Sequence, residues 1–561
     1  MEFLDARRLT GPNLLWNRPG SILDVRCSKE EADILRPLWE SQLRRMLPQL
    51  GWQDEQTCHR QLAGGVSLAV SAPIDALYTA SALNEWAWAA CDADINGQEM
   101  PDFGEAADAL RKQLDEEVNP CLLELEAAAL AHGVSFLWDD DDVSIGLGRG
   151  SQSWSIRNLP APDKVDWSGV HDVPAGLVTG TNGKTTTVRL SQHILRCAGK
   201  SVGLSSTDWI AVNDRIIDRG DWSGPGGARN VLRQPDVDVA VLETARGGLL
   251  RRGLGVSKAD AALITNIAED HLGDFGSQNL EELLDIKWIV SRAVEQGGVL
   301  ILNADDEMLV RKSTEFPGTI VWFALREDNP VVAAHRRSGG TAYVQDGGNL
   351  YRLQGPGREL ICATRDIPIT LGGAAIHNVA NALAAAALTR HLGMTLQEIK
   401  YGLCSMSQDS NPGRCNVYDL RGVKVLIDFA HNPHAMQALF DMASALPARR
   451  RLLAFGQAGD RTDAQIRELA QSAWAIGLDA VHVAELEQYH RGRSHGEVYA
   501  IIRDELLRCG ARADQIRHFE LELESLDAAL EWAEPGDLVI MLALGGSAPV
   551  IEKLESLSAQ S

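Results

Sequence analysis

A loop rich in glycine and threonine, placed between an apolar strand and a helix, narrows the possible folds of this chain to those built on a parallel sheet. Residues 178–187 read Val-Thr-Gly-Thr-Asn-Gly-Lys-Thr-Thr-Thr. The apolar residues 175–178 predict a strand, and residues 188–197 predict the helix that follows. A strand, loop and helix in this order are typical of a parallel sheet covered by helices. The general phosphate-loop pattern has a glycine five residues before Gly183, where this chain has Val178.

The same loop carries groups that bind a nucleoside triphosphate. Phosphate oxygens would meet the backbone N–H groups at the N-terminus of the helix. Lys184 would reach the β- and γ-phosphates, and Thr185 would offer its hydroxyl to Mg²⁺. A plain strand–turn–helix corner is the alternative. We therefore expect ATP and Mg²⁺ as ligands.

Composition argues against several other classes of protein. The 561 residues are enough for three or four domains of about 150 residues each. A formal net charge of −24 argues against a nucleic-acid partner. The nine cysteines form no Cys-x-x-Cys pair, so neither a disulfide framework nor a zinc ribbon is expected. No apolar N-terminal region and no run of 18 apolar residues occurs, which predicts a cytoplasmic protein with no membrane partner.

Shifts in composition divide the chain into three predicted units. Residues 1–165 mix helical and strand patterns, which predicts an N-terminal α+β domain for substrate binding or docking. Residues 166–410 alternate strand and helix patterns, as in a P-loop ATPase-type α/β domain with a parallel sheet. Residues 411–561 begin with Asn-Pro-Gly-Arg and repeat that alternation, which predicts a Rossmann-like α/β domain.

Candidate catalytic residues follow the strands of the central unit. Glu243 ends an apolar run, at the edge where open α/β sheets bind ligands, and could reach Mg²⁺; a strand-end glutamate without a ligand is equally compatible. Arg246 lies in a loop of glycines and arginines that suits an anionic group. His271 could bind a metal as a neutral imidazole, or be a solvated loop residue. Residue type alone favours a solvated helix lysine for Lys287.

Five motifs in fixed order carry a family resemblance. They are Glu243-Thr-Ala-Arg-Gly-Gly, Asp270-His-Leu-Gly, Leu302-Asn-Ala-Asp-Asp, His377-Asn-Val-Ala-Asn and Asp428-Phe-Ala-His-Asn-Pro. In this order they resemble the Mur ligases, and the short glycine loop resembles the ATP loop of Mur ligases and folylpolyglutamate synthetases. Further segments are closer to the Mur-ligase-like half of cyanophycin synthetases, namely Gly220-Asp-Trp-Ser-Gly-Pro, Gly459-Asp-Arg-Thr-Asp, Arg491-Gly-Arg-Ser-His-Gly-Glu and, at the start, Arg8-Leu-Thr-Gly-Pro-Asn.

The resemblance implies roles for loop and metal-site residues. It implies that Glu243 and His271 serve two Mg²⁺ sites. It also implies that Lys287 matches a lysine that many Mur ligases carbamylate, which turns a cation into a carboxylate-like Mg²⁺ ligand. The residues implied to hold the phosphates are Gly180, Thr181, Asn182, Gly183, Lys184, Thr185 and Thr186.

Other roles implied by the resemblance lie closer to the C-terminal unit. Asn378 and Asn381 match residues on the adenine side, with helix capping as the alternative. Arg414 matches an arginine near the phosphates and Asp428 a carboxylate that contacts ribose; an ion pair at the domain boundary is the alternative for both. His431 would face the reacting groups.

The resemblance implies an ATP-dependent, ADP-forming ligase that activates a carboxylate as an acyl phosphate and joins it to an amino acid or amine. In cyanophycin synthetase the corresponding half adds arginine to an aspartate side chain, so a cationic amino acid is expected. Glu485 and Glu487 could pair with a guanidinium, with Arg491 in the same substrate region. Solvated loop charges are the alternative for the two glutamates.

Two other functions stay open at this point. One is a glutamate ligase similar to folylpolyglutamate synthetase, and the other is a catalytically inactive ATP-binding partner of another ligase. The segment before the glycine loop is long enough only for the N-terminal domain, so we expect no ATP-grasp domain and no complete cyanophycin polymerase. The expected partners are a small-molecule or peptide carboxylate, an amine and, as a homo-oligomer, a second copy of the chain.

Overall fold

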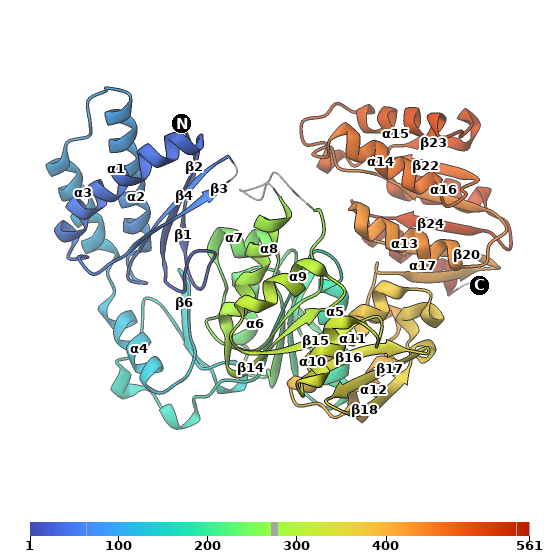
Figure 1. The fold of residues 1–561 in the computed structure, drawn as a ribbon, viewed down its shortest axis with the longest axis horizontal. Helices are drawn as coiled ribbons and strands as arrows, with labels where there is room; N and C mark the ends of the chain where they lie inside the picture. The colour runs from blue at the N-terminus through green and yellow to red at the C-terminus, as the bar shows by residue number, and fades with distance from the viewer. Residues whose placement is uncertain (63, 271–278, 546, 560–561) are drawn as a thin grey trace.

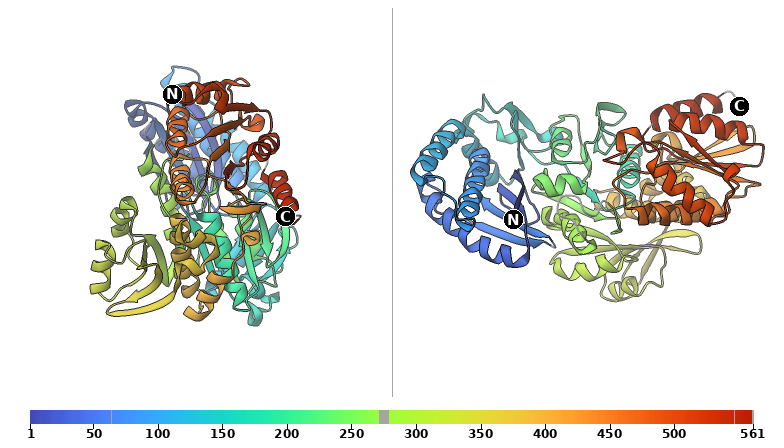
Figure 2. Two further views of the ribbon diagram at one scale, coloured as in Figure 1. Left: turned by 90° about the vertical axis from the view of Figure 1, so that its right-hand side faces the viewer. Right: turned by 90° about the horizontal axis from the view of Figure 1, so that it is seen from above.

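Four sheets organise the residues that this computed structural model describes, which are 1–62, 64–270, 279–545 and 547–559. Figure 1 shows the N-terminal and C-terminal parts at opposite ends of the molecule, with the largest sheet between them. The right-hand view of Figure 2, from above, shows the same order along the long axis. Among the described helices, none combines the length and apolar character that crossing a bilayer requires.

The N-terminal part is an antiparallel sheet covered by helices. Its strands, in sheet order, are β1 (Glu2–Leu9), β2 (Gly20–Arg26), β4 (Gly65–Ser71) and β3 (Thr57–Leu62). The helices are α1 (Lys29–Met46), α2 (Leu77–Ile95), α3 (Phe103–Glu117) and α4 (Pro120–Ala131), and a small sheet follows with β5 (Phe136–Trp138), β6 (Asp142–Ile145) and β7 (Gln152–Ser155). Helices α3 and α4 are separate, because Pro120 disfavours helical geometry at the preceding residue.

The central sheet has seven parallel strands with antiparallel strands at both edges. The parallel strands, in sheet order, are β9 (Val202–Ser205), β12 (Val239–Glu243), β8 (Ala175–Thr179), β13 (Ala259–Ile264), β14 (Val294–Asn303), β15 (Thr319–Ala324) and β16 (Thr341–Asp346). The antiparallel edges are β10 (Trp209–Val212) with β11 (Arg215–Arg219), and β17 (Asn349–Gln354) with β18 (Gly357–Ala363). The predicted parallel sheet is confirmed for the central strands.

Helices cover both faces of this sheet. One face packs against α5 (Lys184–Cys197), α11 (Ile376–His391) and α12 (Leu396–Ser405). The other face packs against α6 (Pro225–Leu232), α7 (Arg246–Arg252), α8 (Leu280–Trp288), α9 (Glu307–Lys312) and α10 (Pro330–Arg337). Adjacent residues of β8 show the alternation, since Leu177 lies in one core and Val178 in the other.

The C-terminal part is a second parallel sheet with one antiparallel edge strand. Its order is β19 (Asn416–Leu420), β20 (Val423–Asp428), β24 (Leu538–Leu542), β21 (Arg451–Phe455), β22 (Ala480–Ala484) and β23 (Ile516–Phe519). One face packs against α13 (Pro433–Ala445), α14 (Asp463–Trp474) and α15 (Glu497–Arg508), and the other against α16 (Glu522–Trp532) and α17 (Ser547–Ser558). The multidomain α/β fold class is confirmed, while the boundaries near residues 165 and 410 stay predictions.

Candidate active site

The glycine loop after β8 adopts a conformation that requires glycine at two positions. Gly180 has φ +142° and Gly183 has φ +83°. A Cβ atom at Gly180 would lie 1.8 Å from Thr265 Oγ1, and one at Gly183 would lie 2.2 Å from Asn381 Oδ1. The loop is therefore packed tightly between the end of β13 and helix α11.

Helix α5 begins at Lys184, so its N-terminal N–H groups face the loop. Lys184 Nζ donates to the carbonyl oxygen of Thr181 at 2.8 Å, and the N–H of Asn182 donates to Asn266 Oδ1 at 3.0 Å. Thr186 is buried on the first turn. This geometry is a ready site for an anion such as a phosphate group.

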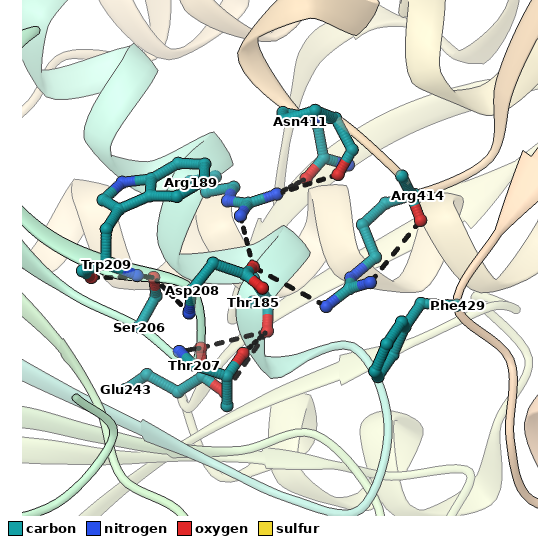
Figure 3. Close-up of polar contacts among 12 residues, drawn as sticks. Thr185, Arg189, Ser206, Thr207, Asp208, Trp209, Glu243, Asn411, Arg414 and Phe429 are labelled. Atoms are coloured by element: carbon teal, nitrogen blue, oxygen red, sulfur yellow. Dashed lines mark hydrogen bonds and ion pairs between the residues drawn. The ribbon is translucent and has the colours of Figure 1, made fainter. Parts of the chain in front are cut away.

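Thr185 and Glu243 meet beside the loop, as Figure 3 shows. The Thr185 hydroxyl donates to Glu243 Oε2 at 3.0 Å, and Thr207 donates its N–H to the same oxygen at 3.4 Å. Glu243 is 1% exposed. Burial raises the pKa of its carboxyl, against the opposing charge of Lys184. A buried carboxylate in this position is stabilised when a cation binds next to it.

The oxygen atoms of this cluster fit Mg²⁺. The ion prefers hard oxygen ligands and commonly takes one or two from protein, with water and phosphate oxygens completing its shell. In the described ranges no group of three or more His, Cys, Asp or Glu side chains is arranged to hold a metal. Thr185 and Glu243 therefore suit an ion that arrives with a nucleotide. His271, the other predicted metal ligand, lies outside the described residues.

Lys287 reaches the glycine loop from α8. Its Nζ donates to the carbonyl oxygen of Gly180 at 2.7 Å, and the residue is 4% exposed. Burial and then the charge of Lys184 hold the pKa of this amine well below its usual value, while Asp270 opposes the shift. The interpretation of Lys287 as a solvated helix lysine is therefore wrong. Arg246 is near enough to lower the same pKa further.

The two predicted adenine-side residues lie on the first turns of α11. Asn378 Nδ2 donates to the carbonyl oxygen of Ile369 at 2.8 Å, and Asn381 Nδ2 donates to Asn378 Oδ1 at 3.1 Å. Both are buried. Helix α11 begins at Ile376 and has no side-chain cap, so the capping alternative is wrong for both residues. Asn381 instead lies against Gly183 of the loop, and Asn378 accepts a hydrogen bond from Asn381.

Residues of the C-terminal unit approach the loop from the other side. Asn432 Nδ2 donates to Asn182 Oδ1 at 2.8 Å. Asp270 accepts from an Arg461 guanidinium nitrogen at 2.9 Å, and its other oxygen lies 3.6 Å from His431 Nε2. The nucleotide loop and the segment before His271 are thus both in contact with the C-terminal part.

Arg414 forms an ion pair at the domain boundary, with Asp208, as the alternative to its nucleotide role expected, whereas Asp428 accepts hydrogen bonds from backbone N–H groups. The Arg414 guanidinium lies 4.4 Å from the centre of the Phe429 ring and 3.7 Å from Asp208. Asp428 Oδ2 accepts from the N–H of Cys415 at 2.8 Å. Both side chains are positioned where the two units meet.

The predicted amine-binding residues fall into different environments. Glu485 is buried, and its carboxylate lies 2.7 Å from His518 Nε2 and 3.1 Å from His490 Nε2. Glu487 is exposed, and Arg491 pairs with Asp460. The structure therefore gives the two glutamates unequal surroundings, and Glu485 already has two imidazole partners.

The sequence interpretation missed Arg189, Thr207 and Asp208. Arg189 is 2% exposed and lies on the buried side of α5, where a charged residue needs a partner. The sequence did offer one signal for Arg189. It places a cationic residue on the core-facing side of the helix that follows the glycine loop. Thr207 and Asp208 lie in the turn between β9 and β10, which no apolar pattern marks.

The fold and this site define an α/β protein with an anion-binding loop at the start of a helix, in which a second α/β unit contacts that loop. Residues 178–389 match the Mur ligase middle domain, and residues 413–545 match the Mur ligase glutamate ligase domain. The chain carries both domains and belongs to the Mur ligase family.

Individual relatives agree with that assignment. The chain is 36% identical to a cyanophycin synthetase of Geminocystis herdmanii over 68% of this chain and 44% of the relative. It is 37% identical to the cyanophycin synthetase of a Synechocystis species over 69% of this chain and 44% of the relative. The chain thus spans less than half the length of these relatives. Escherichia coli FolC, solved with DHPP and ADP, shares the fold at a TM-score of 0.50 and 21% identity, over 69% of this chain and 89% of that one.

Proposed function

We propose that this chain is an ATP-dependent, ADP-forming ligase that joins a carboxylate to an amino acid or other amine. The observation that carries the proposal is the buried contact between Glu243 and the Thr185 hydroxyl, beside a loop with Lys184 at its end. Membership of the Mur ligase family supports it. The same features argue against an inactive partner protein, because such a protein has no need for a desolvated carboxylate at the loop.

The chemistry follows from the poor reactivity of a carboxylate. An oxygen of the substrate carboxylate would attack the γ-phosphorus of ATP, the bond to the bridging oxygen would break, and ADP would leave. The amine nitrogen would then attack the carbonyl carbon of the acyl phosphate, lose a proton, and displace inorganic phosphate. Lys184 and Arg414 would stabilise charge on the transferring group.

Thr185, Glu243 and His271 are proposed to hold Mg²⁺. When bound, the ion neutralises charge on the phosphate oxygens. The N–H groups of Gly183 and the first turn of α5 would orient the phosphates, because those of Thr181 and Asn182 already donate to Asn266. Asn378 and Asp428 would contact adenine and ribose. Closure of the C-terminal unit over the loop would exclude water from the acyl phosphate.

We further propose that Lys287 is carbamylated. Only a neutral amine adds to CO₂, and burial lowers the pKa of Lys287, which favours that neutral form. The amine nitrogen would bond to the carbon of CO₂ and release one proton, which leaves an anionic carbamate. The remaining N–H could still donate to the Gly180 carbonyl, now 2.7 Å away. The carbamate would then offer oxygen ligands close to the Mg²⁺ site.

A cationic amino acid is the proposed amine. The −24 charge and the similarity to cyanophycin synthetases support this choice, and Glu485, Glu487 and Arg491 are the proposed specificity residues. Glu485 is buried between two histidines, and each of its carboxylate oxygens lies against one of them. It would therefore attract a cationic substrate through its negative charge rather than by a bidentate pair with a guanidinium. Since the reaction consumes ATP, we also propose a cytoplasmic location.

The test is a matrix of carboxylates and amines incubated with the purified protein, ATP and Mg²⁺. We expect phosphate release that needs one carboxylate and one amine together, with an amide product visible by mass spectrometry. The Lys184→Met variant is the matched control, since it retains the size of the side chain and loses the charge. Phosphate release that ignores both substrates, or that persists equally in the control, would contradict the proposal.

A further inference from the structure

Arg189 ties the helix of the nucleotide loop to the segment that leads into the C-terminal unit. It lies on α5, and its guanidinium bonds to the Asp208 carboxylate. One terminal nitrogen also donates to Asn411 Oδ1 and to the carbonyl oxygen of Pro412, both at 3.3 Å. The guanidinium lies 4.2 Å from the centre of the Trp209 ring. Figure 3 shows the two side chains next to each other. One side chain thus connects three segments.

Burial of the Arg189 guanidinium costs desolvation free energy, so this arrangement is a poor way to stabilise the fold alone. The Arg189 side chain is 2% exposed, and burial lowers its pKa to about 10 although Asp208 opposes the shift. Within the described ranges, Nε of Arg189 has no hydrogen-bond partner. Well-packed apolar residues commonly stabilise such a position as well as a buried ion pair does. The buried charge of Arg189 therefore points to a role in the site.

Asp208 has a second cationic neighbour, Arg414. The oxygen that binds Arg189 is also 3.7 Å from a terminal nitrogen of Arg414. That distance is too long for a hydrogen bond, so Asp208 attracts Arg414 without using its N–H groups. The Asp208 side chain is 39% exposed and the Arg414 side chain 17% exposed, so this end of the cluster opens towards solvent.

The residue next to Asp208 contacts the metal-site cluster. Thr207 donates its N–H to Glu243 at 3.4 Å, and its hydroxyl lies 3.2 Å from that of Thr185. Thr207 therefore contacts the start of α5, and the neighbouring Asp208 lies close to Arg414 of the C-terminal unit. Because the two residues are consecutive, a displacement of one would also displace the other.

We propose that Arg189 and Asp208 are positioning residues that hold Arg414 on the side of the nucleotide loop, ready to meet the phosphates of ATP. Arg189 holds the segment that leads into the C-terminal unit, through Asn411 and Pro412. Asp208 holds the side chain of Arg414. The proposal rests on the nucleotide role of Arg414 given above. Holding a long side chain near its bound position reduces the conformational entropy lost on binding. Asp208 also screens the repulsion between the two guanidinium groups.

The test is a double-mutant cycle on binding of the non-hydrolysable ATP analogue AMP-PNP in the presence of Mg²⁺. Dissociation constants are measured by calorimetry for the parent, Asp208→Asn, Arg414→Ala and the double variant. We expect Asp208→Asn to weaken binding about fivefold and Arg414→Ala about tenfold or more. We expect the double variant to bind no more weakly than Arg414→Ala, because Asp208 acts through Arg414. A general structural defect would make the two losses multiply.

A matched control comes from another ion pair that involves the same helix. Asp214→Asn removes the exposed partner of Arg196 on α5, and it should bind the analogue like the parent. If Asp208→Asn does not fold, as judged by circular dichroism, Arg189→Lys replaces it in the cycle. Lysine keeps the charge but cannot bridge Asp208 and the linker as a planar fork does.

The outcomes separate this inference from the proposed function. Parent affinity in Asp208→Asn, or losses that multiply in the double variant, would overturn the positioning role while the ligase proposal stands. A parent protein that does not bind the analogue would overturn both.

Discussion

Replacing Lys287 by methionine should remove a pH dependence from the stability of the central sheet. The amine is buried against Gly180, and its pKa lies well below the usual value of about 10.4. Between these two pKa values the unfolded chain binds one more proton than the folded chain, so stability rises with pH across that window. The slope approaches about 1.4 kcal/mol per pH unit and vanishes below the folded pKa. Methionine cannot titrate, so its variant lacks this slope.

The replacement also has a pH-independent cost. The hydrogen bond to Gly180 is lost, which leaves a buried carbonyl without that donor and costs about 1–3 kcal/mol. The variant should therefore be relatively most stable at low pH and lose ground steadily as the pH rises. The two contributions are separable, because only one of them depends on pH.

Hydrogen–deuterium exchange is the suitable assay in a multidomain chain, since it reports local opening. Peptides covering β8 and α8 are compared between variant and parent at each pH, in CO₂-free buffer so that the amine is not carbamylated. Comparison at equal pH cancels the intrinsic exchange rate. Lys400→Met, at an exposed position on α12, is the control and should follow the parent. Equal pH slopes for the Lys287 variant and the parent would refute the reasoning.

Three further replacements test the site directly. Lys184→Ala should abolish phosphate release while circular dichroism stays unchanged, because the ammonium is needed where charge develops on the phosphates; full activity would contradict the loop assignment. Glu243→Ala should lower kcat at least about a hundredfold and weaken the response to added Mg²⁺, measured in a magnesium titration; a parental titration curve would place the metal elsewhere. Glu485→Gln should reduce the preference for arginine and lysine over glutamate and alanine in a competition assay read by mass spectrometry. If the parent itself joins glutamate or alanine fastest, the cationic amine is wrong.

The glycine loop and its flanking strands could be predicted because their signals are local. Gly180 and Gly183 occupy backbone angles that other residues adopt with strain, and Lys184 begins the helix directly after them. Apolar runs marked β8 and β12, and the latter ends at Glu243. Each of these statements depends only on residues close together in the sequence.

Contacts between distant segments could not be predicted in this way. Lys287 is buried because α8 presents it to Gly180, more than one hundred positions earlier in the chain. Arg189 finds its partners in the turn before β10 and in the linker at Asn411. A helical pattern shows that a position is on a buried face, but it does not show which residue of another segment that position contacts. The antiparallel strands at both edges of the central sheet were missed for a similar reason, since their pairing follows from the sheet they extend.

The most direct test of the proposed ligase follows the oxygen atoms of its substrate. Once the screen has identified the carboxylate, that substrate is labelled with ¹⁸O and the products of a single turnover are analysed by mass spectrometry. If the carboxylate is activated as an acyl phosphate, one ¹⁸O atom should appear in inorganic phosphate, and the nucleotide product should be unlabelled ADP. Label in AMP, or unlabelled phosphate beside the amide product, would contradict the central claim.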